Sequence, residues 1–370
     1  MAYAAPVGKR LAAADVGVHV SDYSSPTHDL PGACPPPEGS ADTGVPWHYG
    51  DPHAEQRRLV AGRGAVDLSH RGVITVTGPD RLSWLHSLTT QHLEGLAAGS
   101  SSTALILSPH GHVGHELHLS DDGTTTWITV EPGTAADLVA YLDSMRFMLR
   151  VEVADVSHDW AVVWEPRREP NADRVTWLVP ADVAGAGSTD AGSDRGGDAS
   201  KYVDHRPDVM VGREVIVPRA ELLAAMGDEP AGTWALEALR VAAAAPRLGF
   251  ETDHRTLPHE VGWIGPAVHL AKGCYRGQEA VARVHNLGAP PRRLVLLHLD
   301  GGAEALPAHG DAVVVGEREI GWVGSAARHY ELGPIATAVI KRSVDPSAEL
   351  TIRSAHGDLI AAQEPVVLVR

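Results

Sequence analysis

The sequence has few of the residues on which secreted and membrane-spanning proteins depend. Only two of its 370 residues are cysteine, so a disulfide framework is excluded and a reducing cytoplasm is the expected compartment. No run of about 18 apolar residues occurs, which predicts the absence of a membrane span. Charged side chains interrupt residues 1–20, so this stretch is not expected to form the apolar core of a signal peptide.

Positive charge is also scarce. Lysine and arginine together number 31 against 47 aspartates and glutamates, which gives a formal net charge of −16. A chain with this charge is repelled by a phosphate backbone, so direct binding to nucleic acid is disfavoured. The sequence also lacks the P-loop, GxSxG, HExxH and paired CxxC patterns of common nucleotide, hydrolase and zinc sites. These absences exclude several large function classes and leave the remaining motifs to carry the prediction.

The order of the predicted elements indicates an α+β fold. Between residues 45 and 289, short strands are interrupted by amphipathic helices, which is typical of an α+β domain. Residues 1–44 are rich in proline, serine and glycine and are predicted to form a flexible extension, and the low-complexity segment 184–200 is predicted to be a disordered loop. Residues 290–370 contain short strands separated by glycine-containing turns, which predicts a C-terminal antiparallel β-barrel.

The stretch from Lys272 to Glu279 surrounds one of the two cysteines with glycine and positive charge. Cys274 lies between Lys272 and Arg276, just before a helix that is predicted to begin near Gly277. Nearby cations and a helix N-terminus both favour the thiolate, so Cys274 is a candidate for nucleophilic, redox or metal chemistry. The same pattern also suits a small, half-buried cysteine in a glycine turn, and the sequence leaves this alternative open.

A second polar cluster places four histidines within nine residues: His110, His112, His115 and His118. If this segment forms a strand, His112, Glu116 and His118 share one face and His115 points to the other. His112 and Glu116 are then about 13 Å apart, which is too far for the two side chains to share one ion. We therefore predict a turn followed by a polar-faced strand, and no metal site.

The string Lys272-Gly273-Cys274-Tyr275-Arg276-Gly277-Gln278-Glu279 resembles the K-G-C-Y-x-G-Q-E signature of the YgfZ family, folate-binding relatives of the glycine-cleavage T-protein. Other blocks are similar to the family in the same order, namely Val45–Gly50, Gly64–Gly72, Val76–Arg81 and Gly249–Glu251, so the resemblance covers about residues 45–370. It implies a T-protein-like α+β fold with a C-terminal barrel, and tetrahydrofolate or a derivative as the cofactor.

The resemblance also implies two groups of site residues. The working residues would surround the thiol: Cys274, Lys272, Tyr275, Gln278 and Glu279. The residues around the folate would be Leu68, His70, Glu116, Arg240, Glu251 and Arg276.

The sequence departs from the T-protein pattern at two places. His115-Glu116 occupy the place of an acidic pair, where an aspartate of the T-protein works at the folate nitrogen. Met210 stands by spacing at the position of a glutamate that meets the pterin, and only Gly212 and Glu214 of that motif persist. Because a methionine side chain cannot accept the N–H donors of a pterin, the ring must be held differently.

Three functions follow as hypotheses. The resemblance implies an accessory protein that binds tetrahydrofolate and supports the assembly or repair of iron–sulfur enzymes, including tRNA-modifying ones, through Cys274. Its partners would be those enzymes or their assembly proteins. The alternative is a folate-dependent aminomethyltransferase or demethylase of T-protein type, which the order of the blocks supports and the two departures oppose. Direct RNA binding is the third, and the net charge disfavours it.

Overall fold

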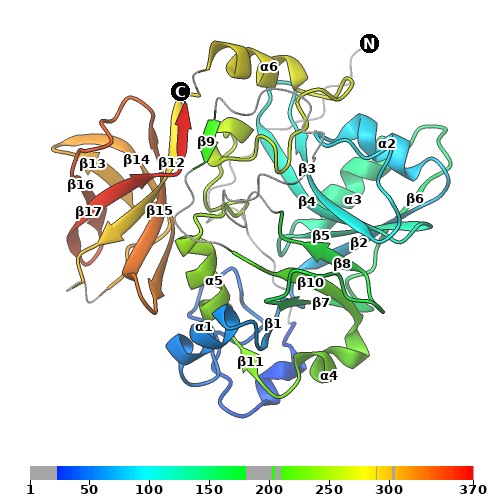
Figure 1. Ribbon diagram of the computed structural model, residues 1–370, viewed down its shortest axis with the longest axis horizontal. Helices are drawn as coiled ribbons and strands as arrows, with labels where there is room; N and C mark the ends of the chain where they lie inside the picture. Colours follow the sequence, from blue (N-terminus) through cyan, green and yellow to red (C-terminus); the bar gives the residue numbers. More distant parts are fainter. Residues whose placement is uncertain (1–22, 181–201, 205–209, 289, 302–304, 370) are drawn as a thin grey trace.

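The computed structural model describes residues 23–180, 202–204, 210–288, 290–301 and 305–369. These residues form two five-stranded sheets, a closed six-stranded barrel and a short two-stranded pairing. The barrel lies on one side of the molecule and the two sheets on the other, with helix α5 (Thr233–Ala242) between them (Figure 1). The segment 184–200, predicted to be a disordered loop, lies outside the described residues.

The first sheet is antiparallel, with its strands in the order β3-β4-β5-β2-β6. These strands are β2 (Gly72–Thr77), β3 (Ser100–Leu107), β4 (Val113–Asp121), β5 (Thr125–Val130) and β6 (Glu152–Asp155). Helices α2 (Arg81–Leu88) and α3 (Ala135–Ser144) cover one face, where their apolar side chains pack against alternate residues of the strands. The opposite face of β4 carries polar residues and lines a cavity.

The second sheet is buried on both faces. Its strand order is β11-β1-β7-β10-β8, and the pairing is antiparallel except between β1 and β11. The strands are β1 (Ala65–Asp67), β7 (Trp160–Glu165), β8 (Thr176–Leu178), β10 (Arg213–Pro218) and β11 (Pro230–Ala231). Helix α4 (Leu222–Met226) packs on one face, and α1 (Pro52–Val60) and α5 pack on the other. Covering both faces explains the continuous apolar run at the centre of β7.

The C-terminal region forms the expected antiparallel barrel. Its strands close in the order β12-β15-β14-β13-β16-β17 around an apolar core. They are β12 (Arg292–Leu299), β13 (Ala312–Val315), β14 (Arg318–His329), β15 (Gly333–Lys341), β16 (Leu350–Ser354) and β17 (Gly357–Pro365). The chain then leaves the barrel, because β18 (Val367–Val369) pairs instead with β9 (Tyr202–Asp204). Helix α6 (Gln278–Leu287) precedes the barrel in the chain.

The observed elements confirm the α+β prediction with a C-terminal antiparallel barrel. The six barrel strands all lie within residues 290–370, the range that the sequence predicts for the barrel. Among the described residues, the longest apolar helices fall short of the length that crossing a bilayer requires.

The predicted flexible extension is wrong for residues 23–44, which are ordered against strand β1 of the second sheet. A 3-10 helix spans Pro26–Asp29, and the hydroxyls of Ser25 and Thr27 both donate to Oδ2 of Asp67 at 2.5 Å. Asp42 is 4% exposed. Composition suggested a tail because the segment has few apolar residues, but buried polar contacts rather than apolar packing hold it in place.

Candidate functional site

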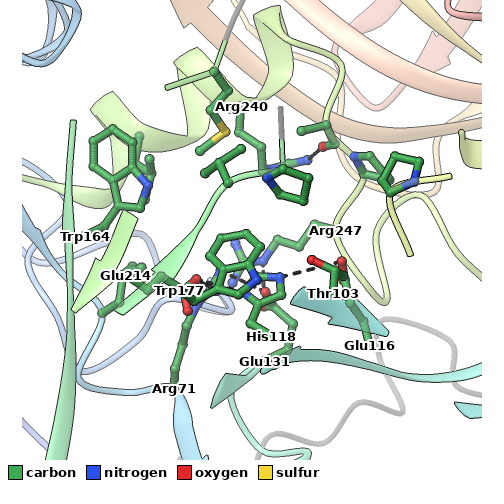
Figure 2. A pocket seen from close by; sticks show the side chains of 18 of the residues that line it. Arg71, Thr103, Glu116, His118, Glu131, Trp164, Trp177, Glu214, Arg240 and Arg247 are labelled. Carbon is green, nitrogen blue, oxygen red and sulfur yellow. Dashed lines mark hydrogen bonds and ion pairs between the residues drawn. The ribbon is translucent and has the colours of Figure 1, made fainter. Parts of the chain in front are cut away.

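A cavity lies between the two sheets and is closed on one side by α5 (Figure 2). It holds about 740 Å³ of space, including its open mouth. Polar and apolar side chains both line it: Leu68, Arg71, Thr103, Glu116, His118, Glu131, Trp164, Trp177, Met210, Glu214, Leu236, Glu237, Arg240, Arg247 and Trp263, with Val179, Pro180, Ala245, Pro246 and Pro266. A concave site with mostly apolar walls and a few convergent polar groups is typical of a small-molecule site.

Strand β4 brings two titratable side chains into the cavity. Glu116 and His118 are two residues apart and therefore lie on the same face, as the sequence predicted. His115 points the other way and lies 6.3 Å from the ring of Tyr141 in α3, measured between ring centroids. His112 precedes the strand and is not among the cavity residues.

His118 is held between an acidic group and an aromatic ring. Its Nδ1 lies 3.0 Å from Oε1 of Glu214, and its ring stacks on the indole of Trp177 with centroids 3.6 Å apart and planes 1° from parallel. Arg71 also donates to Glu214, at 2.6 Å. The hydroxyl of Thr129 donates to the other oxygen of the same carboxylate. Burial alone would lower the pKa of His118, but the neighbouring carboxylates of Glu214 and Glu116 raise it to about 9. His118 is therefore a cation at neutral pH.

Arg247 is the centre of a second group of buried charges. Its guanidinium lies 2.7 Å from Asp42, 2.7 Å from Glu131 and 3.4 Å from Glu237. Burial opposes the charged form of Arg247, but these three carboxylates outweigh it and raise its pKa well above the usual value. The pKa of Asp42 is well below its ordinary range, because Arg247 and His70 offset the effect of burial. Arg247, Asp42 and Glu131 are therefore all charged at neutral pH, and each buried charge has a partner of opposite sign.

Arg240 connects the cavity with the barrel. It pairs with both carboxylate oxygens of Glu237 at 2.9 Å and donates to Oγ of Ser325 in β14 at 2.6 Å. Glu251 lies behind it, 3.3 Å from Nη1 of Arg240, and accepts from Thr337 of β15 at 2.5 Å. Both barrel contacts fix the orientation of Arg240 toward the cavity.

A few polar groups of the cavity have fewer hydrogen-bond or ion-pair partners than these residues. Among the described residues, Oγ1 of Thr103 and Nε1 of Trp164 are buried without a hydrogen-bond partner. In the same part of the chain, Glu116 has a single ion-pair contact, 3.7 Å from Nε2 of His118, whereas the other cavity glutamates have several partners. Thr103 of β3 pairs in register with His118 of β4, so Thr103 lies beside the two titratable side chains (Figure 2). Buried polar atoms without partners mark a place where a ligand can complete the hydrogen bonding.

The residues predicted around a folate divide into three groups. Leu68, Glu116 and Arg240 line the cavity, and so does Met210. His70 and Glu251 lie behind the wall: His70 contacts Asp42 at 3.0 Å, and Glu251 is completely buried against Arg240. Arg276 is exposed and is not among the cavity residues. The roles of these residues in binding remain predictions.

The cysteine stretch lies outside the cavity lining. Cys274 is exposed, so the half-buried alternative is wrong. The expectation that Lys272 places its charge beside the sulfur is corrected as well. The Nζ atom of Lys272 donates to the carbonyls of His86 and Thr89, the latter at 2.5 Å, and lies 5.2 Å from the ring centroid of Tyr275. Burial lowers the pKa of Lys272 to about 8. Its two hydrogen bonds bind the carbonyl end of α2.

The other residues of the stretch position the loop. Gln278 donates to the carbonyl of Lys272 at 3.4 Å, and Glu279 pairs on the surface with Arg283 at 3.0 Å. Gly277 has a φ of +84°, and a Cβ there would lie 2.6 Å from the carbonyl oxygen of Ser108. A glycine is therefore required where the cysteine loop meets the turn before β4. The catalytic roles predicted for Tyr275, Gln278 and Glu279 stay predictions.

A cluster on the surface has the composition of a metal site. His86, His92 and Glu94 bring their ligand atoms within 4.8 Å of one another. However, the backbone N–H of Leu93 donates to Nδ1 of His86 at 3.2 Å, so the neutral ring carries its proton on Nε2. His86 then has no free lone pair for an ion, and we assign no metal to this cluster.

Sequence reasoning missed several of the charged residues at the cavity. Arg71 lies in a block quoted for the resemblance, but Glu131, Glu237 and Arg247 carry no motif. Arg247 and Asp42 are 205 residues apart in the chain, so no local pattern predicts their contact. Trp177, the aromatic partner of His118, carries no motif either.

Two family models match this chain. The GCVT N-terminal domain matches residues 41–164, and the glycine cleavage T-protein C-terminal barrel domain matches residues 292–366. An aminomethyltransferase of Rubrobacter xylanophilus is 27% identical over 84% of this chain and 84% of its own length. A putative chloroplastic transferase of Arabidopsis thaliana is 26% identical over 73% of this chain and 64% of its own length.

The fold is also similar to a solved structure. The glycine cleavage system aminomethyltransferase T of Bartonella henselae aligns with a TM-score of 0.68 over 92% of this chain and 94% of its own. The two sequences are 18% identical, so this likeness establishes the fold and leaves the chemistry to the site.

Proposed function

This chain combines a GCVT N-terminal domain with a glycine cleavage T-protein C-terminal barrel domain, and on that premise we propose that its cavity binds a reduced folate for one-carbon transfer. The observation that carries the proposal is the set of cavity polar groups with no hydrogen-bond partner or with only one contact. Glu116 presents a carboxylate, Trp164 an N–H and Thr103 a hydroxyl among apolar walls. A flat ring with N–H donors and polar edge atoms matches this set.

The pterin of a folate has the chemistry that these groups require. Its N–H groups can donate to Glu116, and a ring acceptor can receive the indole N–H of Trp164. Met210, Leu236 and Trp263 supply apolar surface for the ring faces. The acceptor that the sequence lacks at Met210 is thus provided from β4 by Glu116. When bound, tetrahydrofolate supplies a nucleophilic nitrogen that carries the one-carbon unit.

The ion pairs around the cavity hold the ligand-facing groups in position. Arg240 and Arg247 are each bound by carboxylates on several elements, so they are pre-organised rather than free to pair with a ligand anion. Glu116 is the cavity carboxylate with the fewest contacts in the described structure, so it is best placed to orient a proton on a ligand nitrogen. The relatives named aminomethyltransferase support one-carbon transfer as the class of reaction.

Calorimetric titration with tetrahydrofolate tests the proposal directly. We expect wild-type protein to bind with a micromolar dissociation constant and Thr103→Val to bind about tenfold more weakly. Valine has the same shape as threonine but lacks the hydroxyl that would form a hydrogen bond with the ligand. The stability of the ligand-free variant should be unchanged or higher, since the Thr103 hydroxyl has no partner among the described residues.

A matched control variant shows whether a loss of affinity comes from the cavity or from a general effect of the substitution. Thr75→Val changes the same side chain on β2, away from the cavity residues, and should leave the affinity unchanged. Absence of any heat up to about millimolar tetrahydrofolate, an affinity of only about −4 kcal/mol, would remove the folate from the assignment.

A second candidate function is an accessory role of YgfZ type for Cys274. It is favoured by one observation: the thiol is exposed in a loop that is not part of the cavity lining, where a protein partner can reach it. In this role the thiol would act on an iron–sulfur enzyme or its assembly protein, while the cavity binds the folate. Nothing in the charge of the chain favours a direct contact with RNA.

Replacement of Cys274 by alanine tests this role. We expect the activity of iron–sulfur enzymes under oxidative stress to fall to the level of cells without the protein, because the working thiol is lost. Cys34→Ala is the matched control, since Cys34 is the other free cysteine and should complement fully. If Cys274→Ala also complements fully, the thiol has no such role.

A further inference from the structure

The imidazole of His118 has its two nitrogens in different surroundings. Its Nδ1 faces Glu214, which is 3% exposed in its side chain and also accepts from Arg71 at 2.6 Å. Burial would raise the pKa of Glu214, but His118 and Arg71 lower it to about 2, so its carboxylate is ionised throughout the neutral range. An ionised acceptor at Nδ1 keeps a proton on that nitrogen.

The second nitrogen of His118 is directed toward the cavity side of the network. Nε2 lies 3.7 Å from Oε1 of Glu116, a distance that places these atoms as neighbours without a direct hydrogen bond. Both side chains line the cavity (Figure 2). Because the tautomer is fixed at Nδ1, Nε2 is the position at which the ring gains or loses its titrating proton.

The face of the ring is fixed as well. The indole of Trp177 lies parallel to the imidazole at 3.6 Å, and its own Nε1 donates to the carbonyl of Ser102 at 3.2 Å. Trp177 is thereby anchored to β3 and cannot rotate freely. A stacked indole also stabilises an imidazolium through its π face. His118 is thus constrained in tautomer, in plane and in position.

We propose that Glu214 and His118 form a carboxylate–imidazole dyad that exchanges the Nε2 proton with a ligand nitrogen in the cavity. The proposal rests on the proposed one-carbon transfer and adds to it the group that moves the proton. Glu214 orients His118 and stabilises its cation, and Glu116 lies beside Nε2 on the path to the ligand. The ligand class is an amine whose nitrogen changes its number of bonds to carbon.

The proton balance of such a step closes without another reactant. As the bond between the donor nitrogen and the one-carbon unit breaks, the bonding pair stays on that nitrogen, which takes the proton from Nε2. The imidazole is then neutral. When the acceptor nitrogen forms its new bond to carbon it must lose a proton, and Nε2 takes it. The dyad returns to its starting state, and nothing is oxidised or reduced.

The charges that face His118 come from several elements. Glu116 belongs to its own strand, Glu214 comes from β10, and Arg71 from the turn before β2 faces it through Glu214. Glu131 contacts Arg71 and belongs to the same network. Two carboxylates next to the ring outweigh the more distant guanidinium, which is why the cation is the stable form of His118 at neutral pH.

Fluorescence of Trp177 tests the dyad without any ligand, because a protonated imidazole quenches an indole stacked on it. The difference between wild-type protein and Trp177→Phe isolates this tryptophan from the other eight. We expect the difference signal to rise with a midpoint near pH 9, and His118→Gln to abolish the rise. A midpoint near the ordinary histidine value of about 6.5 would overturn the dyad, and so would no titration at all.

Transfer kinetics test the role of the proton. With tetrahydrofolate and an aminomethyl donor, we expect His118→Gln to reduce the rate at least about 100-fold while the dissociation constant of tetrahydrofolate changes little. The wild-type rate should fall as the pH rises through 9, and the variant should lack this fall.

If His118→Gln transfers at the wild-type rate, the dyad has no catalytic role and the one-carbon assignment stands. If wild-type protein binds no tetrahydrofolate, the one-carbon assignment fails, and the fluorescence titration still decides whether the dyad exists.

Discussion

Replacement of Arg247 by methionine is expected to lower the free energy of unfolding by about 3–5 kcal/mol, because it leaves buried carboxylates without their cation. Asp42 and Glu131 each lie 2.7 Å from this guanidinium, and Arg247 itself is 4% exposed in its side chain. Methionine keeps much of the length of the side chain, so packing loss contributes little. The dominant effect is the burial of uncompensated negative charge.

The acid side of the stability curve gives the same variant a second signature. Burial raises the pKa values of Asp42 and Glu131, but Arg247 opposes this effect and holds both below their unfolded values of 3.8 and 4.5. A carboxyl group with a lowered folded pKa stabilises the protein above its unfolded pKa, and this contribution is lost as the pH falls through the folded value. Without Arg247 only His70 and Arg71 oppose the effect of burial, so both pKa values rise, and acid unfolding of the variant should begin at a higher pH than in wild-type protein.

Denaturant unfolding followed by circular dichroism, at neutral pH and through the acid range, measures both effects. Arg255→Met is the matched control, because Arg255 is exposed in the same loop region and its loss should change stability by less than about 0.5 kcal/mol. Equal unfolding midpoints for the two variants would show that the Arg247 network contributes no more than a surface charge.

The sequence predicted those features that depend on neighbouring residues. The period of two along β4 placed Glu116 and His118 on one face and His115 on the other, and the structure agrees. Glycine-containing turns between short apolar runs located the barrel strands, because a turn residue acts on its immediate neighbours.

The features that sequence reasoning missed depend on contacts between distant segments. Asp42 lies in a segment whose composition resembles a tail, and its partner Arg247 follows a run of alanines. Neither residue has a local pattern that distinguishes a buried ion pair from a solvated charge. Lys272 was misjudged for a similar reason: its proximity to Cys274 in the chain suggested a shared function, whereas its ammonium group binds carbonyls at the end of α2.

The cavity and the cysteine loop are therefore two separate sites with different chemistry. The cavity contains Glu116 and the Glu214–His118 pair, whereas the exposed Cys274 lies in a loop outside the cavity lining. The two places are joined mechanically, since Gly277 of the cysteine loop packs against the turn at Ser108 that leads into β4. One-carbon chemistry and thiol chemistry can consequently be separated by single substitutions in this protein.

Glu116→Gln is expected to slow one-carbon transfer by about 1000-fold or more while weakening tetrahydrofolate binding by less than tenfold. Glutamine has the same shape and still accepts a hydrogen bond from a pterin N–H, so the ring remains bound. It carries no charge and cannot take up a proton, so a ligand nitrogen loses the group that orients its proton. Removal of this carboxylate also removes one of the groups that raise the pKa of His118, which should therefore fall below about 9.

Three measurements distinguish this role from a merely structural one. Calorimetry gives the affinity, the rate of methylene-tetrahydrofolate formation gives the transfer step, and the Trp177 fluorescence titration gives the shift at His118. Glu317→Gln is the matched control, because Glu317 is 95% exposed in its side chain in the barrel and its loss should change none of the three. A wild-type transfer rate in Glu116→Gln would contradict the assignment. A slow rate with an unshifted His118 titration would limit Glu116 to contact with the ligand, because its charge would then not reach the imidazole.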